Sequence, residues 1–262
     1  MPENKYALIT GASSGIGLCY SRELASCGYN LFVVSNQEPE LNETADDIRQ
    51  SFGVQVYSLC IDLTQDDAAE MLLSCVREQQ MDLEIVINNA GVFFFNNLIE
   101  TEWGRVEFML RLHIRTVTRM TQLFGRWMAE RGHGYILNMS SMSAWMSMPG
   151  INVYNSTKAY ILNFSRSMWY ELHPHGVSVT AVCPGTIDTG LYGLAPNLRR
   201  LAVRLGISMP PEKLAKKGLR AMFSRRKSVV PGWINRPFVF LCKHVPDWVV
   251  FLIIRKISKY MK

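Results

Sequence analysis

Short runs of Val, Ile and Leu alternate along the chain with longer stretches of helical periodicity, and this alternation restricts the fold more than any other feature of the sequence. Helical stretches include residues 15–27 and 102–131. The strands that we predict are residues 6–10, 31–35, 54–61, 85–88, 135–139 and 177–182. Buried strands that are separated by helices form a parallel sheet with helices on both faces. We therefore predict an α/β fold with a doubly wound parallel sheet.

Nothing in the sequence divides the chain into several domains. Its 262 residues, of which 48% are hydrophobic, suit one domain with a large core. We therefore predict a single domain over residues 1–262. Gly and Pro interrupt the alternation in residues 190–212, where we expect a loop or a helical flap over the sheet.

The location of the protein follows from three features of the sequence. The longest strongly apolar stretch, residues 248–254, is seven residues long, whereas a membrane-spanning helix needs about 20. The first ten residues lack the pattern of a signal peptide. The six cysteines are scattered and have no metal-ligand spacing. We expect a cytoplasmic protein without a disulfide framework or a metal site.

The positive charge of the chain is concentrated near its C-terminus. Residues 1–197 contain 12 Lys and Arg against 20 Asp and Glu, and residues 198–262 contain 16 against 2. Such a segment is either a solvated surface or a site for an anionic partner. The sequence lacks the aromatic spacing of a surface that stacks on nucleic-acid bases, so we expect no nucleic-acid partner. Residues 246–262 are basic and apolar, and predict a terminal helix that packs on the domain or lies on a membrane surface.

A glycine-rich segment, TGASSGIG at residues 10–17, follows the first predicted strand and opens the first helix. Glycine allows a tight turn at Gly11, close approach of a pyrophosphate at Gly15, and packing of the helix on the sheet at Gly17. The exposed N–H groups and the positive end of the helix then hold phosphates. No Lys-Ser/Thr pair follows, which excludes a Walker loop. The residues that we expect to bind a dinucleotide here are Gly11, Ser13, Ser14, Gly15, Ile16 and Gly17.

The end of the second predicted strand bears on the choice of cofactor. An acidic residue at this place holds the ribose 2′-hydroxyl of NAD(H) in many dinucleotide sites. Here Asn36 stands there, and Glu38 is the nearest acid. With no carboxylate to repel a 2′-phosphate, the sequence favours NADP(H), although no arginine is present to pair with that phosphate and Glu38 keeps NAD(H) open.

Tyr154 and Lys158 are four residues apart, so they are neighbours on one face of a helix. A phenol has a pKa near 10, and a cation within a few ångströms lowers it by roughly 1–3 units. The phenol can then exchange a proton with a substrate oxygen. Ser141, at the end of a predicted strand, can donate a hydrogen bond to the same oxygen. A Tyr–Lys pair with this spacing alone is common by chance, but its occurrence together with the glycine-rich turn and the serine is improbable as a coincidence.

Over residues 5–192 the chain resembles the one-domain short-chain dehydrogenase/reductase family, in particular its bacterial ketoacyl reductases. The matching segments are TGASSGIG (10–17), Asp62-Leu63, NNAG (88–91), Ser141, YNSTK (154–158) and PGTIDT (184–189). The resemblance implies a Rossmann-type fold, catalysis by Ser141, Tyr154 and Lys158, and assembly as a homodimer or homotetramer.

The resemblance also implies contacts with NAD(P)(H) beyond the glycine-rich turn. Asp62 and Leu63 would flank the adenine, and Lys158 would bind the nicotinamide ribose. The other implied contacts are Asn89, Ala90 and Gly91 at the centre of the cofactor, and Pro184, Gly185, Ile187 and Thr189 at the nicotinamide.

His113 departs from the family pattern, because the family usually has an asparagine at this place in its fourth helix, where it links a water to the active-site lysine. His113 falls on the apolar stripe of that helix, which is typical of a core histidine. A functional interpretation is that the imidazole replaces the asparagine in proton transfer, which predicts activity that depends on pH near 6–7. A weakened activity is the third interpretation.

Large apolar side chains lie beside the motifs, and they indicate an apolar substrate pocket or ordinary core and dimer packing. They are Phe93, Phe94, Phe95, Trp103, Trp145, Met146, Met148 and Tyr192. We predict hydride transfer between NADP(H) and a ketone or secondary alcohol of a lipid-like substrate, such as a 3-oxoacyl thioester or a sterol-like ketone. The alternatives are a non-catalytic dinucleotide-binding sensor or scaffold, and a membrane-associated interaction protein.

Overall fold

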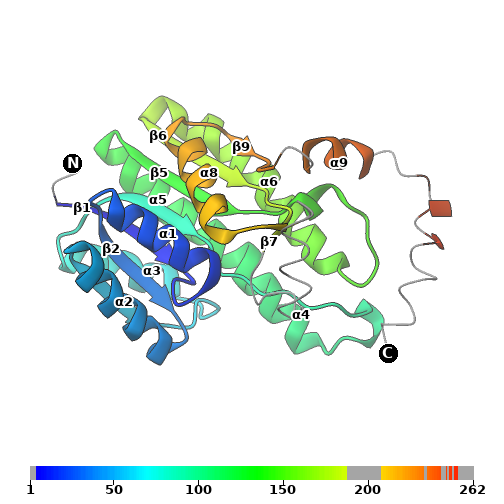
Figure 1. Ribbon diagram of the computed structural model, residues 1–262, viewed down its shortest axis with the longest axis horizontal. Coiled ribbons are helices and arrows are strands. Elements are labelled where there is room, and N and C mark those ends of the chain that lie inside the picture. The colour runs from blue at the N-terminus through cyan, green and yellow to red at the C-terminus, as the bar shows by residue number, and fades with distance from the viewer. Residues whose placement is uncertain are drawn as a thin grey trace.

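The computed structural model describes residues 4–187, 208–232 and 235–242, with Pro246, Trp248, Val249, Phe251 and Leu252 beyond them. Within these residues, seven parallel strands form one sheet in the order β3–β2–β1–β4–β5–β6–β9, with helices on both faces (Figure 1). The strands of this sheet are β1 (Lys5–Thr10), β2 (Asn30–Ser35), β3 (Val56–Cys60), β4 (Asp82–Asn88), β5 (Gly134–Met139), β6 (Val177–Val182) and β9 (Ser228–Val229). The chain begins inside the sheet and winds outward in both directions, which confirms the predicted doubly wound fold.

The helices form two layers that cover the sheet (Figure 1). Helices α1, α2 and α8 contribute to the core on one face, and α3, α5 and α6 to the core on the other. The helices are α1 (Gly15–Ser26), α2 (Glu38–Phe52), α3 (Ala68–Glu78), α4 (Trp103–Leu110), α5 (Val117–Arg131), α6 (Asn152–Leu172), α8 (Pro211–Phe223) and α9 (Asn235–Cys242), with short 3₁₀ turns at Leu98–Glu100, Met142–Trp145 and His173–His175.

The strands are mainly apolar because both faces of the sheet are covered. Leu8 and Ile9, which are neighbours on β1, are fully buried in the cores on opposite faces, and Phe32 and Val33 on β2 repeat the arrangement. A sheet that is exposed on one side would instead alternate apolar and polar residues. The continuous apolar runs in the sequence are therefore the direct consequence of two helical layers.

The structure alters three details of the predicted elements. The strand expected at residues 54–61 covers only Val56–Cys60, and β4 begins three residues before the predicted start. The helix expected at 102–131 contains a π-helical segment, Arg111–Thr116, between α4 and α5. The short strands β7 (Thr186–Ile187) and β8 (Ser208–Met209) form a separate parallel pair that the sequence did not predict.

Residues 190–207 of the flap predicted at 190–212 lie outside the described residues. The described part of that range forms β8 and the start of α8. Most of the tail predicted at 246–262 is also outside the described residues. In the described part of the chain, no helix has both the length and the hydropathy needed to cross a membrane.

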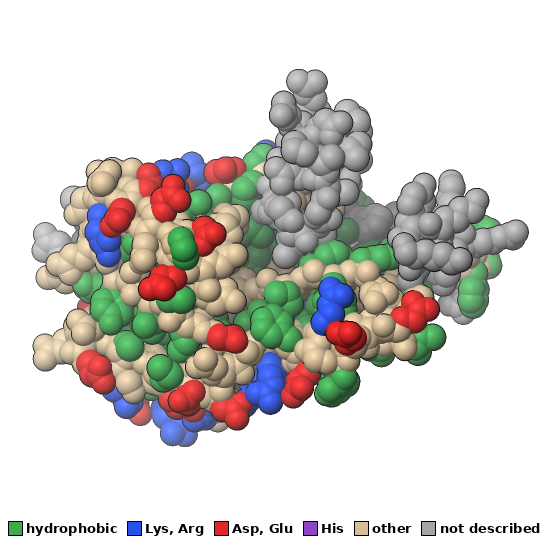
Figure 2. Space-filling view, turned by 90° about the horizontal axis from the view of Figure 1, so that it is seen from below, with side chains coloured by type: hydrophobic (Ala, Val, Ile, Leu, Met, Phe, Trp, Pro, Cys, Tyr) green, Lys and Arg blue, Asp and Glu red, His purple; other side chains and the backbone are tan. Residues whose placement is uncertain are grey.

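The described surface carries acidic and basic side chains side by side (Figure 2). Arg22 pairs with Asp47 at 2.7 Å, and Arg111 pairs with Asp66 at 2.9 Å. Each of these side chains is more than 40% exposed, and solvent screening leaves such pairs little net contribution to stability. The fold is therefore held mainly by its two apolar cores.

Candidate active site

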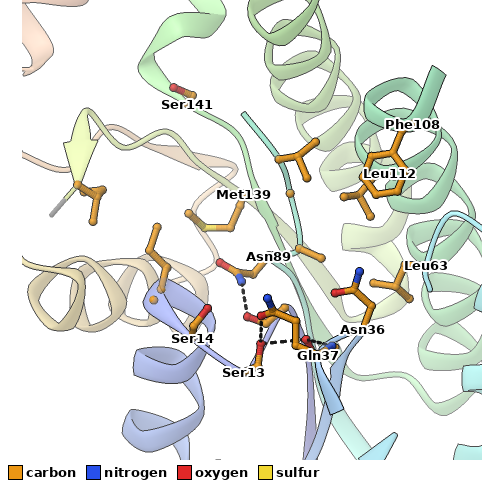
Figure 3. A pocket seen from close by; sticks show the side chains of 18 of the residues that line it. Ser13, Ser14, Asn36, Gln37, Leu63, Asn89, Phe108, Leu112, Met139 and Ser141 are labelled. Atoms are coloured by element: carbon orange, nitrogen blue, oxygen red, sulfur yellow. Dashed lines mark hydrogen bonds between the residues drawn. The ribbon is translucent and has the colours of Figure 1, made fainter. Parts of the chain in front are cut away.

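The carboxyl ends of the parallel strands border a cleft of about 610 Å³. The order of the sheet reverses between β1 and β4, and the loops that leave these strands in opposite directions open a crevice there. Figure 3 shows Ser13 and Ser14 from the turn after β1, Asn36 and Gln37 after β2, and Ser141 after β5 around this cleft. Residues from eight segments that are separate in the sequence thus share one cavity.

The turn between β1 and α1 has a backbone that favours glycine. Gly11 (φ +64°) and Gly15 (φ +56°) lie in the left-handed region, where a side chain causes strain. At Gly17 a Cβ would overlap the carbonyl oxygen of Gly11 and come within 2.7 Å of Nδ2 of Asn89. Gly17 therefore packs against the turn and the loop after β4, rather than against the sheet as predicted.

This turn fits the phosphates of a dinucleotide. Ser14 occupies the N-cap of α1, but its side chain makes no capping hydrogen bond to the helix. The backbone N–H groups in the first turn of a helix have no partner within that helix, and together with the helix dipole they attract anions. Gly11, Ser13, Ser14, Gly15 and Ile16 line the cleft, so the uncapped end of α1 borders the cavity.

Side-chain hydrogen bonds connect the glycine-rich turn to the loop after β4. Oγ1 of Thr10 accepts hydrogen bonds from the backbone N–H groups of Asn89 (3.0 Å) and Ala90 (3.1 Å). In return, Nδ2 of Asn89 donates to the carbonyl oxygens of Thr10 (3.0 Å) and Gly11 (3.3 Å). Two of the predicted cofactor motifs thus form one hydrogen-bonded unit.

The end of β2 is polar and uncharged. Ser13 donates a hydrogen bond to Oε1 of Gln37 (3.0 Å), and the hydroxyl groups of Ser13 and Ser35 lie 2.9 Å apart. Asn36 also lines the cleft and is exposed. Asp62, which follows the next strand, β3, is the acidic residue among the described residues that line the cleft. The end of β2 therefore presents hydroxyl and amide groups to the cleft.

Asp62 and Leu63 border the cleft just after β3. Oδ1 of Asp62 accepts hydrogen bonds from the backbone N–H (2.9 Å) and the hydroxyl group (2.8 Å) of Thr64. The hydroxyl group of Thr116 donates to the carbonyl oxygen of Leu63 at 2.6 Å. Local bonds therefore hold a carboxylate and an apolar side chain together at this edge of the cavity.

Tyr154 and Lys158 enter the same cleft from α6, and Ser141 enters it from the segment after β5. The ring of Tyr154 is only 7% exposed, and it packs edge-to-face on Phe93 with ring centroids 5.1 Å apart. Nζ of Lys158 lies 5.5 Å from the centroid of the Tyr154 ring and donates to the carbonyl oxygen of Met139 at 2.9 Å. Oγ of Ser141 accepts from the backbone N–H of Ser143 at 3.1 Å.

Burial lowers the pKa of Lys158 from its ordinary value to about 8. At neutral pH the side chain is therefore still mainly an ammonium ion. This positive charge is held beside a buried phenol in a cleft with a phosphate-binding turn, an arrangement that suits proton transfer to a carbonyl oxygen.

Pro184 and Ile187 also line the cleft. The carbonyl oxygen of Pro184 accepts a hydrogen bond from the backbone N–H of Met142 (2.8 Å), which ties this segment to the one that carries Ser141. Gly185 packs against Asn235, since a Cβ at Gly185 would lie 2.7 Å from Nδ2 of that side chain. Thr189, the last predicted residue of this segment, lies outside the described residues.

The sequence profile of the short chain dehydrogenases matches residues 5–196. The chain belongs to the short-chain dehydrogenase family. It is 24% identical over 261 residues to the very-long-chain 3-oxoacyl-CoA reductase of Homo sapiens, covering 97% of this chain and 80% of that protein. It is 31% identical over 188 residues to 17-beta-hydroxysteroid dehydrogenase type 3 of Mus musculus, covering 71% and 61%.

Solved structures of other short-chain dehydrogenases share the fold. A short-chain dehydrogenase from Sphingobium yanoikuyae in complex with NADPH is 29% identical, with a TM-score of 0.78 over 87% of each chain. A 7beta-hydroxysteroid dehydrogenase is 25% identical, with a TM-score of 0.82 over 98% of this chain and 96% of the other. The predicted family and Rossmann-type fold are therefore confirmed, and the protein is an oxidoreductase that acts on CH–OH or C=O groups with NAD(P)(H).

His113 lies in the π-helical segment of this short-chain dehydrogenase and is fully buried. Its Nε2 accepts a hydrogen bond from the backbone N–H of Val92 (3.0 Å), and its Nδ1 lies 2.9 Å from Oγ1 of Thr157. Burial, and to a lesser degree the charge on Lys158, hold the pKa of His113 well below its ordinary value. A neutral imidazole argues against the expectation that this residue makes activity depend on pH near 6–7.

Several residues that line the dehydrogenase cleft were not predicted. Phe108 and Leu112 contribute an apolar wall, and Met139 and Ser140 come from the end of β5. The four-residue spacing of Phe108 and Leu112 was a usable pattern. It was missed because the apolar stripe read along residues 102–131 assumed one regular helix, whereas a π-helical segment follows α4. Trp103, which was expected near the pocket, is 68% exposed.

Proposed function

We propose that this protein reduces the carbonyl group of an apolar, lipid-like ketone with NADPH, and that 3-oxoacyl thioesters and steroid-like ketones are its substrate class. The observation that carries the proposal is that Ser141, Tyr154 and Lys158 share one cleft with the glycine-rich turn. Phe108 and Leu112 form an apolar wall of that cleft. The names of the relatives, a very-long-chain 3-oxoacyl-CoA reductase and a 17-beta-hydroxysteroid dehydrogenase, support the same substrate class.

The three side chains have distinct roles in this mechanism. Tyr154 donates a proton to the carbonyl oxygen of the substrate. The ammonium group of Lys158 favours the ionised phenol and binds the nicotinamide ribose. Ser141 donates a hydrogen bond to the substrate oxygen as negative charge develops on it. The nicotinamide, when bound, supplies the hydride.

The cofactor contacts that we propose follow the lining of the cleft. The N–H groups of the glycine-rich turn bind the pyrophosphate, and Asp62 and Leu63 flank the adenine. The loop of Asn89, Ala90 and Gly91 supports the centre of the cofactor. Pro184, Gly185, Ile187 and Thr189 bind the nicotinamide.

Substitution of Tyr154 tests the reaction. Tyr154→Phe removes the proton donor but keeps the ring on Phe93, and general acid catalysis is worth about 100-fold to 10,000-fold in rate. We expect kcat for a long-chain 3-oxoacyl thioester to fall by about 100-fold or more, while the Kd for NADPH changes by less than about 3-fold. Tyr160→Phe, which alters an exposed tyrosine on the same helix, is the matched control and should retain activity.

The substrates that are turned over separate the candidate functions. NADPH oxidation is followed with a 3-oxoacyl thioester, a steroid ketone and a small polar sugar ketone. Turnover of the sugar alone would contradict the lipid-like substrate class. Tight binding of NADPH with no turnover of any ketone would indicate a sensor or scaffold instead of an enzyme.

The preference for NADP(H) rests on the uncharged end of β2. A carboxylate there would repel a 2′-phosphate and accept a hydrogen bond from a 2′-hydroxyl group. We expect Asn36→Asp to weaken NADPH binding by about 10-fold or more and to strengthen NADH binding, as measured by cofactor fluorescence. Equal affinities of the unchanged protein for the two cofactors would contradict the preference.

Assembly and membrane contact are further parts of the proposal. We expect a homodimer or homotetramer, with α6 in the contact, because the stacked rings of Tyr160 and Phe164 lie on this helix and Tyr160 is 37% exposed. Light scattering after gel filtration would show a monomer if this is wrong. We expect residues 246–262 to bring the protein to anionic membranes, and vesicle pelleting with and without this segment tests it.

A further inference from the structure

His113 connects the loop after β4 to the catalytic helix α6. On one side its Nε2 contacts the backbone N–H of Val92, which directly follows the loop of Asn89, Ala90 and Gly91. On the other side its Nδ1 contacts Thr157, which lies between Tyr154 and Lys158 on α6. These partners are 21 and 44 residues away in sequence. A single side chain therefore bridges two segments of the site.

The hydrogen-bond partners decide which nitrogen of His113 carries the proton. The hydroxyl group of Thr157 donates to the carbonyl oxygen of Tyr154 at 2.8 Å, so its oxygen can only accept from the imidazole. The backbone N–H of Val92 is a donor and requires an acceptor at Nε2. His113 is therefore neutral, with its proton on Nδ1.

The surroundings of the ring leave it little freedom to move. His113 is fully buried, and its ring packs edge-to-face on that of Tyr154 with centroids 5.9 Å apart. A Cβ on Gly91 would lie 3.0 Å from Nε2 of His113 and 3.7 Å from Nζ of Lys158. The imidazole and the ammonium group thus meet at Gly91, and the phenol ring packs on the imidazole, so a shift of the imidazole would disturb both of the other groups.

We propose that His113 is a positioning residue whose neutral imidazole holds the Gly91–Val92 backbone and the Tyr154–Thr157 turn in register, so that Tyr154 and Lys158 face the bound substrate. This inference rests on the proposed function of Tyr154 and Lys158. His113 does not relay a proton in the reaction, because its Nε2 faces the backbone N–H of Val92, which exchanges no proton with the site.

The charge state of His113 follows from the groups that surround it. Among the described residues, the titratable groups that interact with the ring are Tyr154 and Lys158, both on α6, and the loop after β4 contributes the uncharged Gly91 and Val92. Protonation would place a second donor at Nε2, facing the N–H of Val92, and would break that bond. The imidazole should therefore stay neutral down to pH 6, and the bridge should persist there.

Imidazole ¹⁵N resonances of the full chain test the tautomer without any need for turnover. The resonances that disappear in His113→Gln are assigned to His113. We expect a protonated Nδ1, an unprotonated Nε2, and no titration between pH 6 and 8. A proton on Nε2, or titration of this ring between pH 6 and 7, would overturn the inference even in a protein that reduces no ketone.

Kinetics of graded substitutions test the positioning role. In His113→Gln the side-chain oxygen reaches about as far as Nε2 and can keep the hydrogen bond from Val92. In His113→Asn the side-chain amide can keep the hydrogen bond to Thr157. His113→Phe fills the space but keeps neither bond. Loss of one hydrogen bond costs about 2-fold to 10-fold. We expect kcat to fall by about 10-fold or more in His113→Phe and by less in the two amide variants, with KM and the Kd for NADPH within about 3-fold.

Thr157→Val provides an independent variant with nearly the same side-chain shape. We expect it to lower kcat by more than His113→Asn, which can keep the bond to Thr157. We also expect it to add little to the loss in His113→Phe, because both changes break the same bridge. A wild-type kcat in both His113→Phe and Thr157→Val, or fully additive losses, would overturn the inference. If His113→Phe fails to fold, as judged by circular dichroism, the amide variants and Thr157→Val still decide the question.

Discussion

Substitution of Gly17 by alanine tests the central claim that the cofactor turn and the loop after β4 are one packed unit. The added Cβ would overlap the carbonyl oxygen of Gly11 and approach Nδ2 of Asn89 to 2.7 Å. Both contacts are with the unit itself, so the variant cannot keep the turn and the Asn89 hydrogen bonds in place. Gly104, in α4, is the matched control, because a Cβ there would meet nothing within 4 Å.

The size of the effect follows from two contributions. Overpacking of a buried site costs about 1–3 kcal/mol. The two hydrogen bonds that Asn89 donates to Thr10 and Gly11 contribute about 0.5–1.5 kcal/mol each. The free energy of unfolding should therefore fall by about 2–6 kcal/mol in Gly17→Ala, which for a chain of this size lowers Tm by roughly 4–24 °C.

Thermal unfolding with and without NADPH measures both consequences of the substitution. Bound NADPH stabilises the folded state in proportion to the logarithm of its concentration over Kd. We expect Gly17→Ala to have a lower Tm and a Kd for NADPH that is about 10-fold or more higher. Gly104→Ala should bind NADPH normally and gain up to about 1 kcal/mol, since alanine favours a helix. A wild-type Tm and Kd in Gly17→Ala would refute the reasoning.

Two further predictions concern the pH dependence of activity and the buried polar network. Burial lowers the pKa of Lys158 to about 8, so its ammonium form is present below that pH and is lost above it. We therefore expect kcat/KM for carbonyl reduction to fall as the pH rises through about 8. A flat pH profile up to about pH 9.5 would contradict this role of Lys158. Asn138 is fully buried and bonds to Asn88 (2.8 Å) and Ser165 (3.0 Å), so Asn138→Ala should leave two buried donors or acceptors unpaired and cost about 2–4 kcal/mol. An unchanged midpoint of urea unfolding would exclude that loss.

The fold could be predicted because its causes are local in sequence. Strands that are buried on both faces leave continuous apolar runs, and the helices between them leave a period of 3.6. β9, at the edge of the sheet, and the pair β7 and β8 were missed because each strand has only two residues. Such short strands have no pattern of their own, and their pairing depends on the neighbours that the fold supplies.

Some features of the candidate site could likewise be predicted from neighbouring residues, and others depend on contacts between distant segments. The turn at Gly11 and Gly15 and the spacing of Tyr154 and Lys158 depend on neighbouring residues, so the sequence was enough to propose them. The polar cluster of Ser13 and Gln37 joins the ends of two strands that are 24 residues apart. No periodicity in the sequence indicates such a contact.

By itself, the sequence determined the order of the six predicted strands and the helices between them, the glycine-rich turn and the face of the helix that carries the phenol and the amine. Only the tertiary structure decided the state of His113. A regular helix was predicted through this residue, but the fold places it in a π-helical segment, buries it and surrounds it with Val92, Thr157 and Lys158. Burial and long-range hydrogen bonds set the protonation of a titratable side chain, and both arise only when distant segments meet.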